Sequence, residues 1–432
     1  MEGFIAIGLL ILLMIIGVPV AWSFAGVLAY LVYAYDANLN TMMLQGYRSL
    51  DSVILIALPL FVLTGYLMQS GGIARRLVDF IEVMIGKRRG GIGASMVMAS
   101  GIFGAIAGTA TAAVASIGTI MIGPLEQRGY PRSYSAALLG ISSLLGILIP
   151  PSITMILFAV VTRQSVAACF AASVGPAVLL IIGLIAANRF SVGRFFNEVT
   201  SAAGDGIGQL PGKGKATLRA IPALSLPVII LGGIYGGIFT PTEAAAVAAF
   251  AAMFIGFFVY RDLNLGSFAR SVVSAAETTG TVILILLFSF MIGRILASER
   301  IPQDLTELVT HLIQNPLLIL IAVNIFLIIA GMIMDDVSVT VVIAPLFLPL
   351  MVESGVHPVH FASIVACSVV IGANSPPVAP ILYMACRIGK VSIHKTVAPA
   401  LALMAFVALP VMIVTTFVPE LSLFLPRILG FI

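Results

Sequence analysis

Two long apolar stretches of the chain are each interrupted by paired prolines, at Pro150-Pro151 and Pro376-Pro377. Proline lacks a backbone donor and clashes with the preceding turn, so two in a row break a helix. In lipid an unpaired backbone group is costly, and a break is tolerated only where protein or a water-filled cavity covers it. The sequence therefore predicts two interrupted helices that are covered inside a membrane protein.

The composition agrees with a membrane location. Of the 432 residues, 60% are apolar and 9% are charged, whereas a soluble domain has about 25% charged residues. A soluble fold could not bury this much apolar surface, so we predict an all-α polytopic membrane protein in the lipid bilayer. The net charge of +4 is not that of a nucleic-acid-binding protein, and we expect no nucleic-acid partner.

The first apolar stretch, 3–35, is longer than the roughly 20 residues that one span needs. It is either one strongly tilted helix or two short helices turning at 17–19, and we expect two. No basic leader precedes it, so a removable signal peptide is not expected. The three cysteines, Cys169, Cys367 and Cys386, lie in apolar segments without metal-ligand spacing and are expected to be core residues.

The two halves of the chain repeat one pattern. Gly65 aligns with Gly293 at a separation of 228 positions, and Pro150-Pro151 aligns with Pro376-Pro377 at a separation of 226. Each half is predicted to contain a spanning helix, a short amphipathic arm, a Gly-rich double segment, a polar turn and a broken helix. Internal symmetry of this kind is typical of repeat architectures.

The charges indicate that the two repeats are inverted. The mouth of the first double segment is basic, with Arg75, Arg76, Lys87, Arg88, Arg89, Arg128 and Arg132. The second mouth is acidic and His-containing, with Glu299, Arg300, Asp304, Glu307, His311, Glu353, His357 and His360. Because basic loops stay cytoplasmic, we expect 75–89, 191–218 and 387–395 inside and 299–316 and 355–360 outside.

Each double segment must enter and leave on one face for this topology to hold. We therefore predict re-entrant helical hairpins with tips at 103–113 and 330–340; two ordinary spanning helices are the alternative. The expected order is N-terminal scaffold helices (1–70), a first repeat (71–190) with hairpin 91–128 and broken helix 132–165, a cytoplasmic connection (191–218), scaffold helices (219–297), a second repeat (298–418) with hairpin 316–355 and broken helix 359–388, and a C-terminal tail (419–432).

Inverted-repeat transporters bind substrate and ions near the midplane, where interrupted helices expose amides and carbonyls. Helix N-termini suit an anion and free carbonyls suit a cation, so such a site can hold a carboxylate together with Na⁺. Asp335 and Asp336 are the acidic residues deep in an apolar stretch, and intramembrane carboxylates indicate function by default. A helix cap is the alternative role, and we favour Asp335 for the site.

The polar residues at the breaks offer oxygen ligands that hard cations prefer. They are Ser142, Ser143, Ser152 and Thr154 in the first half and Ser368, Asn374 and Ser375 in the second. No HExxH motif, Gly-rich phosphate loop or nucleophile with a spaced His is present. Adjacent Asp335 and Asp336 lie about 100° apart on a helix and do not form a facing dyad. We therefore predict that the protein is not an enzyme; a channel remains an alternative.

Five motifs resemble one transporter family. They are "GTATAAVASIG" (108–118), "GILIPPSI" (146–153), "GGIYGGIFTPTEAAAVAA" (232–249), "GMIMDD" (331–336) and "NSPPV" (374–378). Together they resemble the DctM-like large membrane subunit of tripartite ATP-independent periplasmic (TRAP) transporters. For the stretch 240–243 we expect a structural role, because Thr240, Pro241 and Glu243 form the pattern of a capping box at the start of a helix.

The resemblance implies an elevator-type, sodium-driven secondary transporter in the bacterial inner membrane, with scaffold and transport domains. It implies two partners, a periplasmic substrate-binding protein and a small four-helix membrane subunit, here expected on a separate chain. It also implies a small carboxylated substrate and Na⁺ as coupling ion. A sodium/carboxylate symporter that needs no binding protein is the alternative.

The resemblance places the binding sites at the hairpin tips and broken helices. The substrate set is Thr109, Thr111, Ser152, Asp335, Asn374 and Ser375. The sodium set is Gly108, Ser142, Ser143, Pro150, Asp335, Ser338, Ser368, Gly372 and Asn374. The chain departs from the family pattern at Thr109-Ala110, where a Ser-Ser pair is common, and at Ala379 and Ile381, where Gly and Asn are common.

Overall fold

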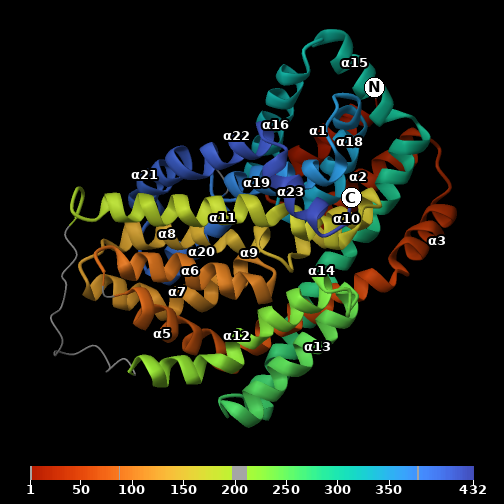
Figure 1. Cartoon of the computed structure of the whole chain (residues 1–432). Coiled ribbons are helices and arrows are strands. Elements are labelled where there is room, and N and C mark those ends of the chain that lie inside the picture. The colour runs from red at the N-terminus through yellow and green to blue at the C-terminus, as the bar shows by residue number, and fades with distance from the viewer. Residues whose placement is uncertain (1, 87, 197–211, 377–378) are drawn as a thin grey trace.

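The computed structural model describes residues 2–86, 88–196, 212–376 and 379–432, and Figure 1 shows it as a bundle of helices. Within these residues the β-type pairing is limited to one isolated bridge between Val192 and Phe196. The described part contains 8 helices long and apolar enough to cross a membrane, or 9 if one bent pair is a single span. The predicted all-α membrane fold is confirmed.

The N-terminal stretch forms two helices, as expected. α1 (Glu2–Ile15) and α2 (Val20–Ala34) are joined at Gly17, whose φ of +92° is accessible to glycine. α3 (Leu39–Leu50) is amphipathic and largely exposed, and a short 3₁₀ turn, η1 (Val53–Ile56), leads into α4 (Ala57–Ser70).

A second group of helices lies beside α4. It consists of α12 (Lys213–Tyr235), α13 (Pro241–Phe254) with the π-helical turn η2 (Ile255–Val259), and α14 (Leu265–Ser298). α13 and α14 pack on α4 directly, and α12 packs on α13 and on α5 (Ile73–Ile85). The expected capping box begins α13: the Thr240 hydroxyl accepts from the Glu243 amide at 3.3 Å, and the Glu243 carboxylate accepts from the Thr240 amide at 2.8 Å. The predicted connection 191–218 ends earlier than expected, because α12 already begins at Lys213; 197–211 lie outside the described residues.

Each repeat contains an arm helix, a helical hairpin, a broken helix and a closing helix, in this order. In the second repeat the outgoing hairpin helix and the closing helix each contain a π-helical turn. The first has α5 (Ile73–Ile85), α6 (Gly91–Ala107), α7 (Ala110–Gln127), α8 (Arg132–Ser143), α9 (Leu145–Leu148), α10 (Ile153–Thr162) and α11 (Val166–Ser191). The second has α15 (Ile301–Leu312), α16 (Pro316–Ile333), α17 (Asp336–Ser338), η3 (Val339–Ile343), α18 (Ala344–Glu353), α19 (Pro358–Gly372), α20 (Pro380–Gly389), α21 (Ile393–Leu403), η4 (Met404–Ala408) and α22 (Leu409–Phe417).

The first hairpin enters and leaves at one end. Arg128, which follows α7, donates to the Gly86 carbonyl at 2.7 Å and to Glu82 at 3.0 Å, and both acceptors lie just before α6. Lys87 of this predicted basic mouth lies outside the described residues. Figure 1 shows α6 and α7 approaching the centre from one end of the molecule and α16 with α18 from the other. The two hairpins therefore enter the molecule from different sides; α16 and the stretch Asp336–Glu353 are also long and apolar enough to cross a membrane.

Matched glycines hold each hairpin against its broken helix. A Cβ at Gly104 of α6 would lie 2.6 Å from Gly146 Cα of α9, and a Cβ at Gly372 of α19 would lie 2.6 Å from Gly331 Cα of α16. These pairs occupy equivalent places in the two repeats, about one repeat apart in sequence. The glycines allow backbone-to-backbone contact that any side chain would prevent.

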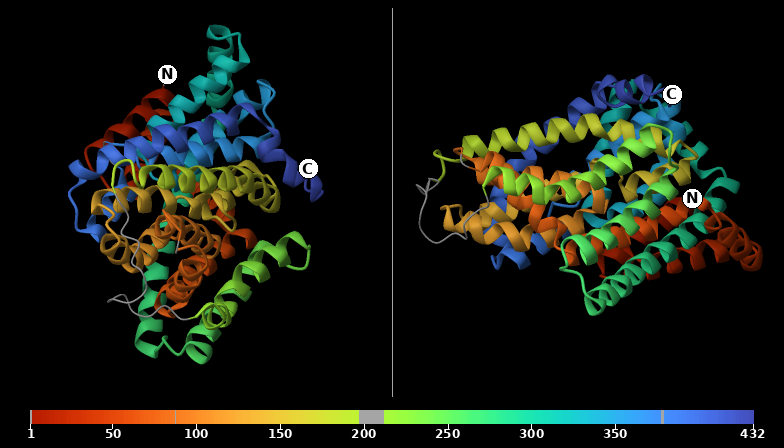
Figure 2. Two further views of the ribbon diagram at one scale, coloured as in Figure 1. Left: turned by 60° about the vertical axis from the view of Figure 1, so that its left-hand side comes forward. Right: turned by 60° about the horizontal axis from the view of Figure 1, so that its bottom comes forward.

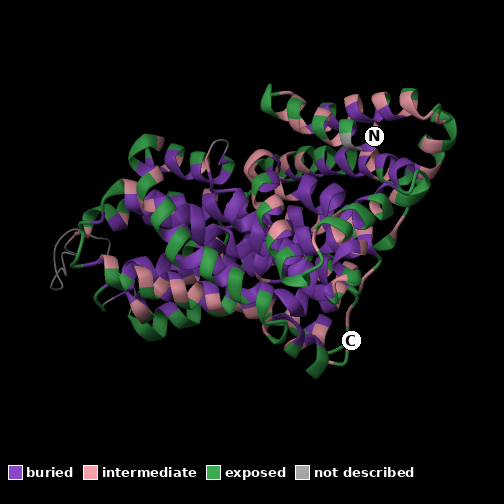
Figure 3. Cartoon of the chain, turned by 90° about the horizontal axis from the view of Figure 1, so that it is seen from above, coloured by how far each residue is buried: buried purple, intermediate pink, exposed green. Residues whose placement is uncertain are grey.

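The core lies where hairpins and broken helices meet. Figure 3 shows buried residues concentrated in the middle of the molecule and exposed ones around it. Side views show the helices of the two repeats interleaved in this region (Figure 2). All three cysteines are free and buried, as expected. The expected C-terminal tail contains a helix, α23 (Glu420–Ile428), which packs on α11.

Candidate functional site: the meeting point of the two hairpin tips

The first tip is two residues long. Gly108 ends α6 in the left-handed conformation, with φ +67°, and its amide donates to the Gly104 carbonyl at 2.9 Å. Thr109 caps α7 by accepting from the Ala112 amide at 3.3 Å. Thr111 is exposed and is the second residue of α7. The tip thus presents the N-terminus of α7, a place where backbone amides suit an anion.

The first Pro-Pro break lies directly beside this tip. α9 stops at Leu148 and α10 begins after Ser152, whose hydroxyl accepts from the Met155 amide at 3.5 Å; the two helical parts are bent by 42°. The Ile153 amide donates to the Gly108 carbonyl at 3.2 Å. A Cβ at Gly108 would lie 2.8 Å from the Pro151 oxygen. Gly108 therefore lies against Pro151 and Ile153 of the first break.

The second tip brings two carboxylates to the same place. α16 ends at Ile333, and Asp335 stands at the N-cap of α17, where its carboxylate accepts from the Ser338 hydroxyl. The Asp336 carboxylate accepts from the Thr154 hydroxyl of α10 at 2.9 Å. Residues 153 and 154 thus bond to the first and the second tip respectively. This pair of contacts joins both hairpins at the start of α10.

The second break places an amide side chain across the repeats. Asn374, buried just after α19, donates from Nδ2 to the Gly140 carbonyl of α8 at 3.4 Å. Its Oδ1 is buried and has no hydrogen-bond partner among the described residues. Ser143 donates to the same Gly140 carbonyl at 2.7 Å. An amide oxygen, a hydroxyl and a carbonyl therefore gather here, and these are the donor types that a hard cation prefers.

The chain continues from this break in an unusual backbone conformation. Ala379 has φ +41°, in the region that favours glycine, and it caps α20. Glycine is what the family pattern commonly has at this position. Pro377 and Val378 lie outside the described residues.

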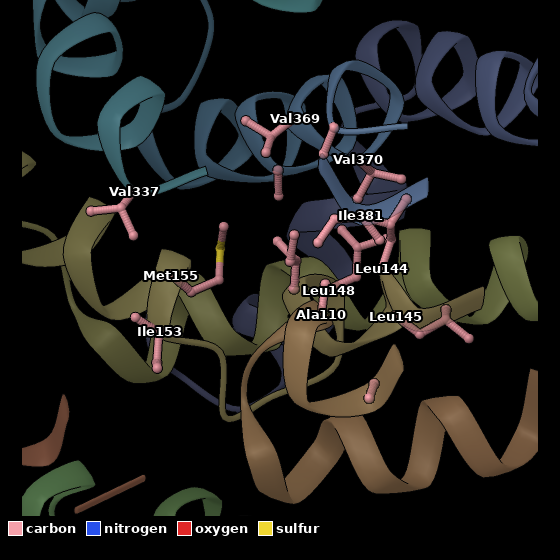
Figure 4. Close-up of a cluster of buried hydrophobic side chains, with 14 of the residues drawn as sticks. Ala110, Leu144, Leu145, Leu148, Ile153, Met155, Val337, Val369, Val370 and Ile381 are labelled. Carbon is pink, nitrogen blue, oxygen red and sulfur yellow. The ribbon is translucent and has the colours of Figure 1, made fainter. Parts of the chain in front are cut away.

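One cluster of buried apolar side chains includes residues close in sequence to both tips and both breaks. Figure 4 shows Ala110 of the first tip, Ile153 and Met155 of α10, and Val337 of the second tip gathered around it. Leu144, Leu145 and Leu148, with Val369, Val370 and Ile381, complete the labelled set. The polar contacts of Asp335 and Asp336 lie at the edge of this cluster and are part-buried, so they are stronger than the same contacts in bulk water.

The structure divides the expected sodium set. Ser143 and Asn374 meet at Gly140, and Asp335 meets Ser338 at the second tip. Ser142 and Ser368 contact the first helix of each hairpin: the Ser142 hydroxyl lies 3.2 Å from the Ser100 hydroxyl of α6, and the Ser368 hydroxyl lies 3.4 Å from Asn324 Oδ1 of α16. Each of these two serines also donates to a carbonyl of its own helix.

Two further members of the expected sets have packing contacts. Gly372 lies against Gly331, and Ser375 donates to the Ile371 carbonyl at 2.8 Å while contacting Met404 sulfur at 3.5 Å. Sequence reasoning did not single out Gly140 or Asn324. Thr154 and Asp336 lie outside the expected binding sets, yet they form a hydrogen bond between the repeats. No local pattern could pair residues so far apart in the chain.

Comparison with solved structures supports the fold. A chain described as the Alcanivorax borkumensis YdaH transporter, with an unusual topology, superimposes with a TM-score of 0.62 at 13% identity, covering 88% of this chain and 87% of that one. At this identity the likeness concerns the fold alone.

Sequence relatives define the family. A C4-dicarboxylate TRAP transporter large permease protein, DctM, of Pseudomonas aeruginosa is 36% identical over 414 residues, covering 94% of this chain and 93% of the relative. An isethionate TRAP transporter permease protein, DctMQ, of Oleidesulfovibrio alaskensis is 34% identical and covers 96% of this chain, which spans 65% of that longer protein.

The family model described as "Tripartite ATP-independent periplasmic transporter, DctM component" matches residues 7–421. This range includes both hairpins, both breaks and the helices around them. The resemblance seen in the motifs is confirmed, and the assignment as a transporter component instead of an enzyme is confirmed with it. The chain belongs to the DctM family of TRAP transporter large permeases and is a multi-pass protein of the bacterial inner membrane.

Proposed function

We propose that this chain is the subunit of a Na⁺-coupled importer that moves a small carboxylated solute across the membrane by an elevator mechanism. The observation that supports this most directly is the meeting of the two tips at α10. The Ile153 amide donates a hydrogen bond to the Gly108 carbonyl, and the Thr154 hydroxyl donates one to the Asp336 carboxylate. The N-terminus of α10 is therefore hydrogen-bonded to both hairpins. A solute bound there would contact elements from both repeats at once.

The chemistry of the meeting point suits an anion and a cation together. The amides at the start of α7 and α10 offer partial positive charge to a carboxylate. At the second break, Asn374 Oδ1, the Ser143 hydroxyl and the Gly140 carbonyl offer neutral oxygens to Na⁺, and Asp335 at the second tip supplies a separate negative charge. Na⁺ binding would reduce the repulsion between Asp335 and an entering carboxylate, which supplies a physical reason for coupling.

The proposal of an elevator mechanism is supported by the way α5 and α15 connect two groups of helices. α4, α13 and α14 form a scaffold in which Tyr66 bonds to Thr278 at 3.0 Å and Ser70 to Ser271 at 2.7 Å. α5 packs on both α12 and α6, and α15 packs on both α14 and α18. The arm helices α5 and α15 thus join the scaffold to the two hairpins. Movement of these two helices would carry both hairpins together.

We propose two partners for the chain. A periplasmic binding protein would deliver the solute, and a small membrane subunit would be supplied by another chain. The longer isethionate relative named DctMQ supports the second partner, because this chain matches only 65% of its length. Exposed apolar side chains on the N-terminal helices, including Trp22 and Tyr33, are available for such a neighbour or for lipid.

The test is uptake by the reconstituted chain with its small subunit and binding protein in liposomes. Na⁺, pH and the binding protein are varied one at a time, with succinate, a C4-dicarboxylate, as the first solute in a panel of organic acids. We expect uptake only with an inward Na⁺ gradient and binding protein present. Full uptake under a proton gradient without Na⁺ would contradict the coupling, and full uptake without binding protein would favour the independent symporter.

A further inference from the structure

A basic cavity of about 560 Å³ lies between the scaffold and the second hairpin. Its walls come from α3, the end of α14, the end of α10, and η3 with α18. Three arginines line it: Arg48, Arg163 and Arg294, and no acidic residue does. We call it the hairpin-2 cavity.

A second cavity of about 640 Å³ lies at the other end of the transport elements, between α7, α20 and Gln69 of α4. Arg132, Arg387 and Lys390 line it, again without an acidic residue. Arg132 is held by Glu126 through two contacts of 2.6 Å. We call it the hairpin-1 cavity. Both volumes are within the roughly 300–1,000 Å³ typical of ligand pockets.

The two cavities are equivalent under the internal repeat. Ala297 of the hairpin-2 cavity corresponds to Gln69 of the hairpin-1 cavity, at the separation of 228 that relates Gly65 to Gly293. Pro345 and Leu346 of α18 likewise take the places of Gly118 and Thr119 of α7. The same architecture thus forms one hollow beside each hairpin.

The strongest correspondence lies at the ends of α10 and α20. Arg163 caps α10 with φ +57°, and Lys390 caps α20 with φ +49°. Glycine is the usual residue in this left-handed cap because it has no Cβ. Both repeats instead place a cation there, each lining its own cavity. Helix-dipole stabilisation accounts for a basic residue near a helix C-terminus, and Arg261 and Arg300 have the same left-handed conformation without lining either cavity. What distinguishes Arg163 and Lys390 is their equivalent position, each beside a cavity.

The positive charges that line the two cavities, apart from that of Arg132, are not neutralised by acidic side chains of the described residues. Arg48, Arg163 and Arg294 are exposed and form no ion pair within the described part of the chain; the same is true of Arg387 and Lys390. A concave surface with one sign of charge concentrates the opposite ion.

We propose that the hairpin-2 and hairpin-1 cavities are the outer and inner vestibules for the anionic solute, with Arg163 and Lys390 as matched anion-holding residues. This inference rests on the proposed function, in which the solute is a carboxylate. It adds a recognition step on each side of the membrane, outside the meeting point of the tips. Arginines near a membrane surface also bind lipid headgroups, so the test separates a free anion from a lipid.

The first measurement uses no transport. Ser49→Cys reports on the hairpin-2 cavity and Thr119→Cys on the hairpin-1 cavity, since both residues line their cavities and are exposed. Rates of modification are measured with small thiol reagents of opposite charge, in the full chain in phosphatidylcholine vesicles. We expect the anionic reagent to react faster at both sites, from outside at Ser49→Cys and from inside at Thr119→Cys. The chain without added cysteines is the background control, because its own cysteines are buried.

The matched variants are Arg163→Gly and Lys390→Gly. Each relieves the left-handed backbone and removes one cavity charge, so the thermal midpoint should not fall. Each should lower the anionic-to-cationic rate ratio severalfold in its own cavity and leave the other cavity unchanged, since nearby charges dominate at physiological salt. Arg427→Gln, at the exposed pair with Glu420 on α23, should change neither ratio.

Succinate and lipid are then compared as ligands. We expect millimolar succinate to slow modification at Ser49→Cys, and Arg163→Gly to raise the KM for succinate uptake more than it lowers kcat. If phosphatidylglycerol in the vesicles slows modification at Ser49→Cys and succinate does not, the cavity binds lipid and the proposal is overturned. Equal rates for both reagents would also overturn it. If the charge preference and succinate protection hold while uptake proves independent of Na⁺, the vestibules stand and the sodium-coupling proposal fails.

Discussion

The two hairpin tips have the same backbone design and different chemistry. The first tip, Gly108-Thr109, is capped by a threonine and has no carboxylate, whereas the second presents Asp335 and Asp336. The second also continues into the π-helical turn η3, where the buried Thr340 hydroxyl has no partner among the described residues, and such turns are frequent at functional sites. The repeat therefore determines where the tips meet, and the residues on each tip determine what they can bind.

The inverted topology is the prediction with the largest effect, because its outcome is all or none. Single cysteines at Lys213 and His357 should be labelled by an impermeant reagent from opposite sides of the membrane. Basic segments stay inside, so Lys213→Cys should react from the cytoplasmic side and His357→Cys from the periplasmic side. Labelling of both from one side would remove the basis for comparing the tips as inverted equivalents.

The matched glycine contacts should be almost as sensitive. Gly372→Ala would place a Cβ 2.6 Å from Gly331 Cα, and Gly146→Ala would meet the Thr109 carbonyl oxygen at 2.7 Å. Overpacking of this kind costs about 1–3 kcal/mol, so both variants should unfold at a lower temperature than the parent protein in a detergent thermal-stability assay.

Gly280→Ala on α14 is the control for that comparison, because nothing lies within 4 Å of its Cβ. It should keep the stability of the parent protein. If Gly146→Ala is tolerated and Gly372→Ala is not, the two repeats do not pack in the equivalent way described above.

The carboxylates test the chemical difference between the tips. Asp335→Asn should reduce uptake about tenfold or more at normal membrane levels, since a lost hydrogen bond to a charged group is worth roughly 1.5–3 kcal/mol. Asp336→Asn should have a smaller effect, because the amide oxygen can still accept from Thr154. Initial uptake rates normalised to the amount of protein in the membrane provide the measurement. The reverse order of the two variants would assign the site role to Asp336.

The smallest expected effects distinguish ion ligands from packing residues at the breaks. Asn374→Ala removes the buried oxygen without a partner and should raise the Na⁺ concentration for half-maximal uptake severalfold. Ser368→Ala should leave it within about twofold, because its hydroxyl donates to the Ile364 carbonyl of its own helix at 2.9 Å. Equal shifts in both variants would argue for a larger ion site that includes α19.

Much of the fold follows from local sequence. Paired prolines and Gly108 interrupt helices through their own backbones, and the capping box of Thr240 and Glu243 begins α13 with four adjacent residues. Breaks, caps and hairpin turns are therefore readable without knowledge of the rest of the chain. Side-chain contacts could not be predicted in this way: the contacts of Ser142 with Ser100 and of Ser368 with Asn324 appear only in the structure.

The sequence alone determined the membrane class, the two interrupted repeats and the family, because these depend on composition, on backbone-restricting residues and on order along the chain. Only the tertiary structure decided which polar groups meet. The bond from Thr154 to Asp336 and the contact of Asn374 with Gly140 join residues 182 and 234 positions apart. Such pairs depend on how two inverted hairpins pack against each other, and the packing of distant segments leaves no local periodicity from which they could be read.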